Sequence, residues 1–169
     1  MTNKKDKFIL IIDKSIIEGA NEKLIELMGR YLSILYRQEQ KYINKAMQSF
    51  DLGFSSYNFL IYISKNEGTN QRQICNILAV DEALATRTMK KLEKKGFIFR
   101  KKDEQDQRSY TLYLTQKGKE MIPILKKFLS DWWSDLTQEL DNQESSFLLK
   151  QLKQMSEKAI QINKTYESK

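Results

Sequence analysis

The feature that most constrains the fold is a long run of apolar residues at helical spacing near the start of the chain. Apolar side chains recur every three or four residues, at Ile16, Ala20, Leu24, Leu27, Tyr31 and Leu35, and then at Ile43 and Met47. This spacing predicts an amphipathic helix. Ser15 and Glu18 have the spacing of a capping box at its start, and Asp51-Leu52-Gly53 ends the pattern. A helix of roughly 30 residues or more is long for a globular domain, so we expect it to pack against more than its own small domain.

Three shorter helices are expected next. The first spans residues 56–65 and is capped by Ser55 or Ser56. The second spans 71–78 and is capped by Thr69 or Asn70, with Gln73 completing a capping box if Asn70 is the cap. The third spans about 81–95, with Asp81 as its cap and Gly96 as its stop. In the second helix we expect the apolar side chains to face inward, namely Ile74, Ile77 and Leu78.

The pattern then changes from a helical period to the alternation typical of strands. Residues 97–102 and 109–114 each predict a short strand, with Tyr110, Leu112 and Leu114 on one face of the second. The polar stretch 103–108 joins them as a hairpin loop. Because two short strands are not stable alone, we expect them to lean on the helices.

Two further long helices close the chain. The fifth helix follows Thr115, and Pro123 within it predicts a kink or a later start. The sixth follows a capping box formed by Asp141 and Glu144, and its apolar stripe contains Phe147, Leu148, Leu152, Met155 and Ile162. The predicted fold is therefore mainly α with a small two-stranded antiparallel hairpin. Residues 55–115 form a winged helix-turn-helix between long helical regions at 15–50 and 116–165.

Composition narrows the possible functions. The net charge of +7 makes a polyanion a plausible partner. The chain contains no histidine, which excludes Ser-His, Cys-His and His-metal sites, and we expect no catalysis, cofactor or metal. No apolar run is long enough to span a bilayer, and the short run 8–12 lacks the features of a signal peptide. We therefore expect a cytoplasmic protein with no membrane partner.

Basic side chains gather where a winged helix would need them. Eight of them lie between residues 87 and 102, against the single acidic residue Glu93. They are Arg87, Lys90, Lys91, Lys94, Lys95, Arg100, Lys101 and Lys102. This cluster covers the end of the third short helix and the first strand, and a local patch of this kind suits phosphate neutralisation.

An Asp-x-Arg motif at Asp106-Gln107-Arg108 is followed by a Leu-Thr-x-x-Gly motif at Leu114-Thr115-Gln116-Lys117-Gly118. With these two motifs the sequence resembles the wing of the MarR family of bacterial transcription regulators. The stretch 91–100 also resembles the end of the family's recognition helix and its first wing strand. The resemblance implies a DNA-binding regulator with a recognition helix at about 81–95 in the major groove and a wing at about 97–114 at the minor groove.

The resemblance also implies roles for individual residues. Arg108 would enter the minor groove from the wing tip, where narrow A·T tracts attract arginine, and Asp106 would orient that wing. Arg87 is the first candidate for a base contact, since arginine reads guanine bidentately, and Thr86 is the second. The face that the recognition helix offers to DNA would contain Ala83, Leu84, Thr86, Arg87, Lys90 and Lys91. Arg100 and Lys102 belong to the basic cluster, and we expect them to contact phosphate.

By the same resemblance we expect a homodimer built from the first helix and the last two. It would bind a pseudo-palindromic operator, act as a repressor, and respond to a small aromatic or anionic effector. Tyr31, Tyr36, Trp132 and Trp133 are candidates for the effector crevice, although aromatic residues at helical spacing are more often core or dimer interface. Cys75 is interpreted as a buried structural thiol rather than a redox sensor.

One alternative function stays open at this stage. Asp81 and Glu82 place negative charge at the start of the recognition helix, where MarR relatives more often carry polar or basic residues. A winged-helix module for protein interaction or assembly, with an incidental basic face, is therefore the second hypothesis.

Overall fold

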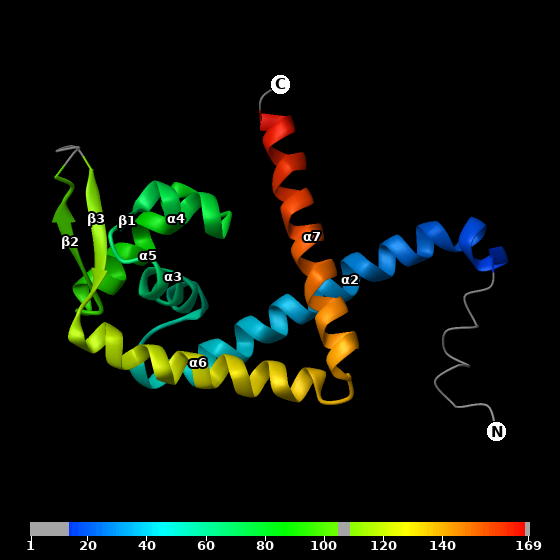
Figure 1. Cartoon of the computed structure of the whole chain (residues 1–169), viewed down its shortest axis with the longest axis horizontal. Helices are drawn as coiled ribbons and strands as arrows, with labels where there is room; N and C mark the ends of the chain where they lie inside the picture. Colours follow the sequence, from blue (N-terminus) through cyan, green and yellow to red (C-terminus); the bar gives the residue numbers. More distant parts are fainter. Residues whose placement is uncertain (1–13, 105–108, 168–169) are drawn as a thin grey trace. The chain divides into compact units, whose positions relative to one another are not determined.

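A computed structural model describes residues 14–104 and 109–167 of the chain. It is mainly helical, with a small antiparallel sheet (Figure 1). The chain divides into two compact units after Lys45. The described part of the first unit is the helix α2, which spans Lys14–Ala46 and confirms the long predicted helix. None of the helices in the described residues is long and apolar enough to cross a membrane.

The second unit begins with a 3-10 turn, η1 (Gln48–Phe50), and the helix α3 (Phe54–Lys65). The predicted caps of α3 were wrong. The helix starts two residues earlier than expected, and Gly53 takes the N-cap position without a side-chain hydrogen bond. Ser56 is buried inside the helix. The start is decided by burial of Tyr57, Phe59 and Leu60 rather than by a local cap.

The next two helices form the helix-turn-helix. The helix α4 (Gln71–Leu78) has the predicted capping box: the Asn70 side chain accepts from the Gln73 backbone N–H, and the Gln73 side chain accepts from the Asn70 backbone N–H. The helix α5 (Glu82–Lys94) is capped by the Asp81 side chain, as predicted. Gly96 follows it at φ 72°, a left-handed conformation that suits glycine. Ile77 was expected to face inward but is exposed, because Ile74 and Cys75 form the buried side of this short helix.

The sheet has one strand more than the sequence predicts. The hairpin strands β2 (Ile98–Lys102) and β3 (Tyr110–Leu114) pair with Arg100 opposite Leu112. A two-residue strand, β1 (Thr69–Asn70), pairs with the other edge of β3, so the order in the described sheet is β1-β3-β2. This strand anchors the wing to the start of α4. Leu112 and Leu114 are buried as expected, whereas Tyr110 is exposed.

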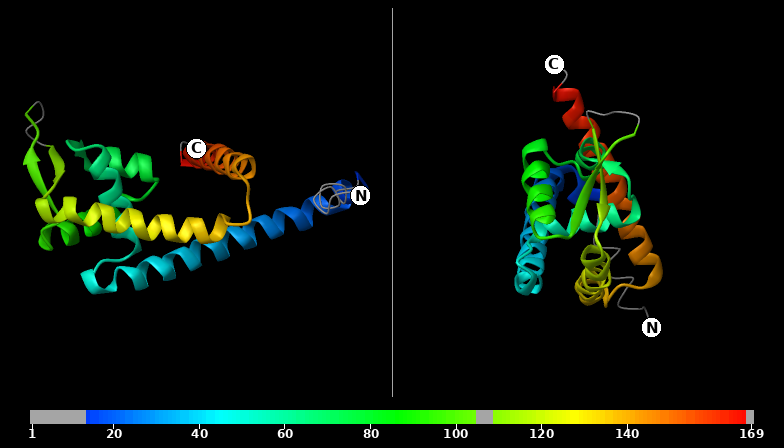
Figure 2. Two further views of the ribbon diagram at one scale, coloured as in Figure 1. Left: turned by 60° about the horizontal axis from the view of Figure 1, so that its bottom comes forward. Right: turned by 90° about the vertical axis from the view of Figure 1, so that its left-hand side faces the viewer.

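Two long helices follow the wing. The helix α6 (Gln116–Thr137) begins directly after Thr115 and runs through Pro123. The helix α7 (Asn142–Glu167) starts at the predicted capping box of Asp141 and Glu144. Figures 1 and 2 show the hairpin at one end of this unit, beside α4 and α5, with α6 leading away from it. The core lies among α3, α4, α5, the sheet and the first half of α6, and its fully buried side chains include Phe59, Leu60, Ile63, Ile74, Met89, Leu92, Leu112 and Leu125.

Candidate nucleic-acid interface

The helix α5 has one buried face and one basic face. Ala85, Met89 and Leu92 are fully buried against the rest of the winged helix. At 100° per residue, the positions opposite this stripe are Ala83, Arg87, Lys90 and Lys94, and all four are exposed. The core therefore fixes which side chains α5 offers to a ligand, and three of those four are cations.

The predicted contact residue Thr86 lies on the flank of α5 that faces α4. It is half-buried, and its hydroxyl oxygen accepts a hydrogen bond of 2.8 Å from the Gln71 side-chain amide. This bond joins the two helices of the helix-turn-helix. Thr86 therefore has a structural partner that the sequence pattern did not reveal.

The opposite flank of α5 carries Lys91 and Lys95, which both contact Asp51. The Lys95 ammonium forms an ion pair with the Asp51 carboxylate, and the Lys91 ammonium lies 4.0 Å from its other oxygen. The hydrogen bond and the charge of Lys95, followed by the charge of Lys91, lower the pKa of Asp51. Lys91 was expected on the DNA-facing side, but it points to this flank.

The wing carries the remaining predicted cations. Arg100 is half-buried, and its Nε atom lies 3.1 Å from a carboxylate oxygen of Glu93, which ties β2 to α5. Lys102 is exposed at the end of β2. Arg108 and Asp106, the predicted wing-tip residues, lie outside the described residues. The structure thus brings Arg87, Lys90 and Lys102 to the exposed surface of one unit.

The motif Leu114-Thr115-x-x-Gly118 joins the wing to α6. The Thr115 side chain accepts from the Gly118 backbone N–H at 3.1 Å, which caps α6, and its hydroxyl donates to the carbonyl oxygen of Gly96 at 2.5 Å. The Thr115 backbone N–H also donates to the Phe97 carbonyl oxygen at 3.0 Å. This motif therefore holds the end of β3 against the turn that follows α5.

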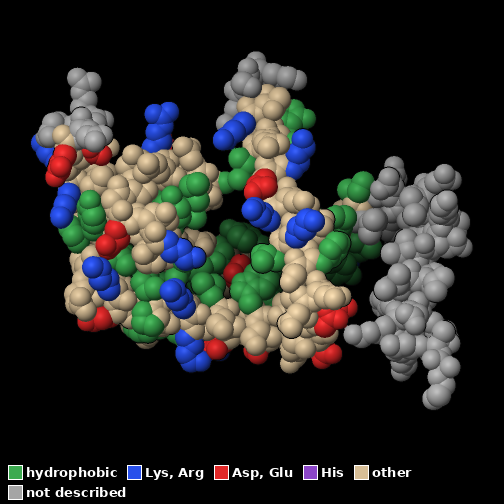
Figure 3. Space-filling view, in the orientation of Figure 1, with side chains coloured by type: hydrophobic (Ala, Val, Ile, Leu, Met, Phe, Trp, Pro, Cys, Tyr) green, Lys and Arg blue, Asp and Glu red, His purple; other side chains and the backbone are tan. Residues whose placement is uncertain are grey.

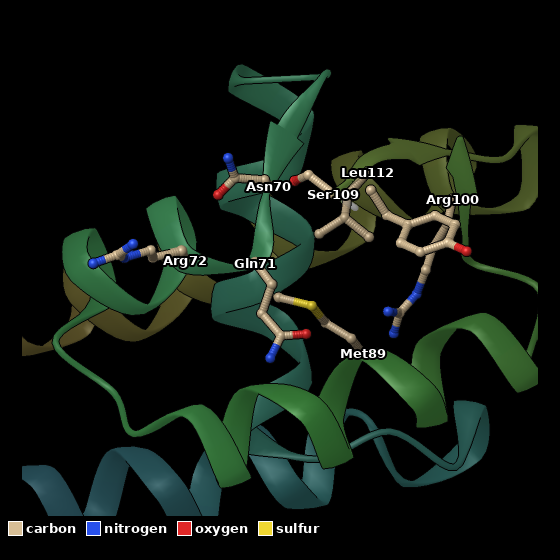
Figure 4. A pocket seen from close by; sticks show the side chains of 8 residues that line it. Asn70, Gln71, Arg72, Met89, Arg100, Ser109 and Leu112 are labelled. Atoms are coloured by element: carbon tan, nitrogen blue, oxygen red, sulfur yellow. The ribbon is translucent and has the colours of Figure 1, made fainter. Parts of the chain in front are cut away.

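A pocket of about 390 Å³ lies between α4, α5 and the sheet (Figure 4). Gln71 and Met89 point toward one another in it, whereas Arg72 points away. No local sequence pattern reveals this pocket, because residues from two helices and the sheet line it together. Its lining residues are Asn70, Gln71, Arg72, Met89, Arg100, Ser109, Tyr110 and Leu112.

The predicted effector residues do not line this pocket. Tyr31 and Tyr36 are exposed on α2, in the first unit. Trp132 is half-buried and Trp133 is exposed on α6. Cys75 is buried, and burial followed by the charge of Glu82 raises the pKa of its thiol. This agrees with the interpretation of Cys75 as a structural residue.

Comparison with known proteins decides the family. The MarR family profile matches residues 55–110. The HTH-type transcriptional regulator BilQ of Clostridioides difficile strain CD3 is 30% identical over 127 residues, which cover 75% of this chain and 86% of that protein. The chain belongs to the MarR family.

Solved structures agree with this assignment. A MarR transcriptional regulator from Methanosarcina mazei Go1 superimposes with a TM-score of 0.76 at 34% identity, covering 81% of this chain and 99% of that one. A MarR-family protein from Listeria monocytogenes, solved in complex with 26mer DNA, has the same fold, with a TM-score of 0.76 at 23% identity; the match covers 78% of this chain and 88% of that one. This MarR protein is thus a transcriptional regulator of the winged-helix type.

Proposed function

We propose that this MarR protein is a homodimeric repressor that binds a pseudo-palindromic operator through α5 and the wing. The observation that carries the proposal is the exposed face of α5, where Arg87, Lys90 and Lys94 lie opposite a fully buried stripe. The major groove is wide enough to admit such a helix. The Listeria monocytogenes protein with this fold was solved with DNA, which supports the same use of the fold here.

Within this proposal the side chains have different tasks. Arg87 reads a guanine, because its guanidinium can donate two hydrogen bonds to one base edge. Lys90 and Lys102 contact phosphates, which gives affinity without sequence preference. Arg108 enters the minor groove, with Asp106 orienting the wing. In the structure, Thr86, Lys91 and Arg100 contact Gln71, Asp51 and Glu93, respectively.

The proposed dimer uses the helical regions 15–50 and 116–165. Exposed apolar side chains on α6 and α7 support this, because large apolar patches on a single chain mark interaction surfaces. Figure 3 shows such side chains along α7. The most exposed of these on α7 are Phe147, Leu149 and Tyr166, and Ile25, Tyr31 and Leu32 are exposed on α2. In a two-fold dimer, two recognition helices would contact half-sites about one helical turn of DNA apart.

A small aromatic or anionic effector would relieve repression by favouring one spacing of the two recognition helices over the other. We propose Tyr31, Tyr36, Trp132 and Trp133 as the aromatic residues involved. A thermal-shift screen tests this part separately. It fails if no compound both stabilises the protein and weakens its binding to DNA.

The central proposal is tested by fluorescence anisotropy with the duplex upstream of the protein's own gene and a scrambled duplex, across several salt concentrations. We expect tighter binding to the native duplex, with the preference retained as salt rises. Arg87→Ala should weaken native binding by about 1–3 kcal/mol and reduce the preference. Lys90→Ala should weaken both duplexes alike. Lys126→Ala, an exposed lysine on α6, is the matched control and should change neither.

A result in which Arg87→Ala and Lys126→Ala behave alike, with both variants folded, would refute the proposed contact surface. Sedimentation of the wild type and of Leu149→Glu tests the dimer. We expect the charged variant to shift the population toward monomer, because burying an unpaired carboxylate in an apolar interface is costly.

A further inference from the structure

Four lysines at the C-terminal end of α5 and one aspartate line a single pocket. Lys90, Lys91, Lys94 and Lys95 line a pocket of about 570 Å³, and its remaining lining residue is Asp51. We call this site the lysine pocket. If each lysine carries a positive charge and Asp51 a negative one, the site keeps three positive charges in excess. The charge of the pocket is therefore far from balanced by the protein itself.

The position of Asp51 follows from the backbone around it. Asp51 ends η1 in a left-handed conformation at φ 51°, and its backbone N–H donates to the Gln48 carbonyl oxygen at 3.0 Å. Its side chain reaches Lys95, which lies 44 residues further along the chain. The carboxylate is thus held at the edge of the lysine pocket by the turn between α2 and α3.

We propose that the lysine pocket binds a backbone phosphate of the DNA duplex, and that Asp51 occupies the site as a built-in competitor until DNA arrives. This inference rests on the proposed function, because it takes α5 to be the helix that meets DNA. It adds a phosphate contact on the Asp51 flank of α5, beside the face that carries Arg87, and it gives Asp51 a role in DNA affinity.

The exposure of the groups makes such an exchange feasible. The side chain of Asp51 is 79% exposed, and those of its partners Lys91 and Lys95 are 46% and 24% exposed. Ion pairs in this setting contribute little, because water and salt screen them. A phosphate can therefore displace the carboxylate without the cost of breaking a buried pair. The hydrogen bond and charge of Lys95, with the charge of Lys91, lower the pKa of Asp51 and so favour its ionised form.

The presence of a competitor also changes how the binding free energy is divided between phosphate contacts and base contacts. Phosphate contacts strengthen binding to every sequence alike. A carboxylate that offsets part of the lysine charge lowers affinity for random DNA as much as for the operator. The protein therefore depends more on base contacts, such as that of Arg87, for its total affinity.

Asp51→Asn tests the competitor directly, because asparagine keeps the shape and tolerates the left-handed conformation. We expect binding to both the native and the scrambled duplex to tighten by about two- to fivefold at low salt, the range of one exposed charge pair. The matched control is Asp131→Asn. It makes the same charge change and breaks an exposed ion pair with Lys127 on α6, and it should leave both affinities unchanged.

A double variant that carries Lys91→Gln and Lys95→Gln tests the phosphate site. We expect weaker binding to both duplexes and a salt slope reduced by about one unit for each protomer that engages DNA. In this background Asp51→Asn should lose its effect, since the two changes act on one site. The proposal is overturned if Asp51→Asn matches Asp131→Asn, or if its gain persists undiminished without the two lysines. If the wild type shows no preference for the native duplex, that result counts against the proposed function. The comparison of Asp51→Asn with and without the two lysine substitutions, measured on scrambled DNA, would still test the lysine pocket.

Discussion

A β-carbon on Gly118 would lie 2.1 Å from the carbonyl oxygen of Phe97. The first turn of α6 therefore packs directly on the backbone that leads from α5 into β2. Only glycine allows this approach, because any side chain begins with a β-carbon. The glycine of the Leu-Thr-x-x-Gly motif thus allows α6 to pack closely against the start of the wing.

We expect Gly118→Ala to destabilise the protein by about 1–3 kcal/mol, the usual cost of overpacking, because the atom it meets belongs to the backbone and cannot rotate away. Urea unfolding at one fixed protein concentration measures the change. Gly29→Ala is the control. It lies in α2 with nothing within 4 Å of the added atom, and it should stabilise the helix slightly. Equal effects of the two substitutions would show that the contact with Phe97 is unimportant.

The hydrogen bond between Gln71 and Thr86 gives a second prediction. Thr86→Val keeps the shape of the side chain and removes the acceptor of the 2.8 Å bond. We expect a loss of about 1 kcal/mol in unfolding free energy and no change in the preference between native and scrambled duplexes. A double-mutant cycle with Gln71→Ala should show coupling between the two sites. A changed sequence preference in Thr86→Val would instead support the base-reading role that the sequence suggested.

The single thiol gives a third prediction. Cys75 is buried and its pKa is raised, mainly by desolvation, so the reactive thiolate is scarce in the folded state. We expect a thiol reagent at pH 8 to modify the native protein far more slowly than the urea-unfolded one. The chain has one cysteine, so the signal has one source. If the native protein is modified at a rate close to that of the unfolded protein, the helix α4 opens readily.

The same shift predicts how stability depends on pH. A thiol whose pKa is raised by folding stabilises the folded state below its ordinary pKa, and that contribution is lost as pH rises through the folded value. The wild type should therefore lose stability relative to Cys75→Ala as pH rises above the ordinary thiol pKa. An unchanged difference over that range would contradict the raised pKa.

The turn of the helix-turn-helix gives a fifth prediction. Ala79 follows α4 at φ 50°, and the next backbone N–H, that of Val80, donates to the Cys75 carbonyl oxygen at 3.1 Å. A left-handed alanine is strained by about 1–2 kcal/mol, so Ala79→Gly should stabilise the fold by about 0.5–1 kcal/mol after the entropy cost of glycine. Ala159→Gly, at an exposed position within α7, should destabilise by about 1 kcal/mol. Thermal unfolding of the two variants should therefore shift in opposite directions.

Some features were fixed by the sequence because the residues that form them are neighbours. The capping boxes at Asn70 and Asp141, the Asp81 cap and the Gly96 stop each depend on groups within about four residues. The basic face of α5 follows in the same way from helical periodicity, because its buried stripe determines what lies opposite. Patterns of this kind also predicted the order of helices and strands.

Other features were decided only when distant segments met. The strand β1 forms because Thr69 pairs with Leu112. The sequence around position 69 has no strand pattern of its own. The N-cap of α3 is Gly53 rather than Ser55 or Ser56, because burial of the apolar side chains of α3 outweighs a local side-chain cap. The lysine pocket needs Asp51 beside a helix that starts some thirty residues later. Local sequence determines the backbone hydrogen bonds within one turn of a helix. Contacts across the core depend instead on how all the elements pack. That packing brings Thr86, Lys95 and Gly118 to their partners.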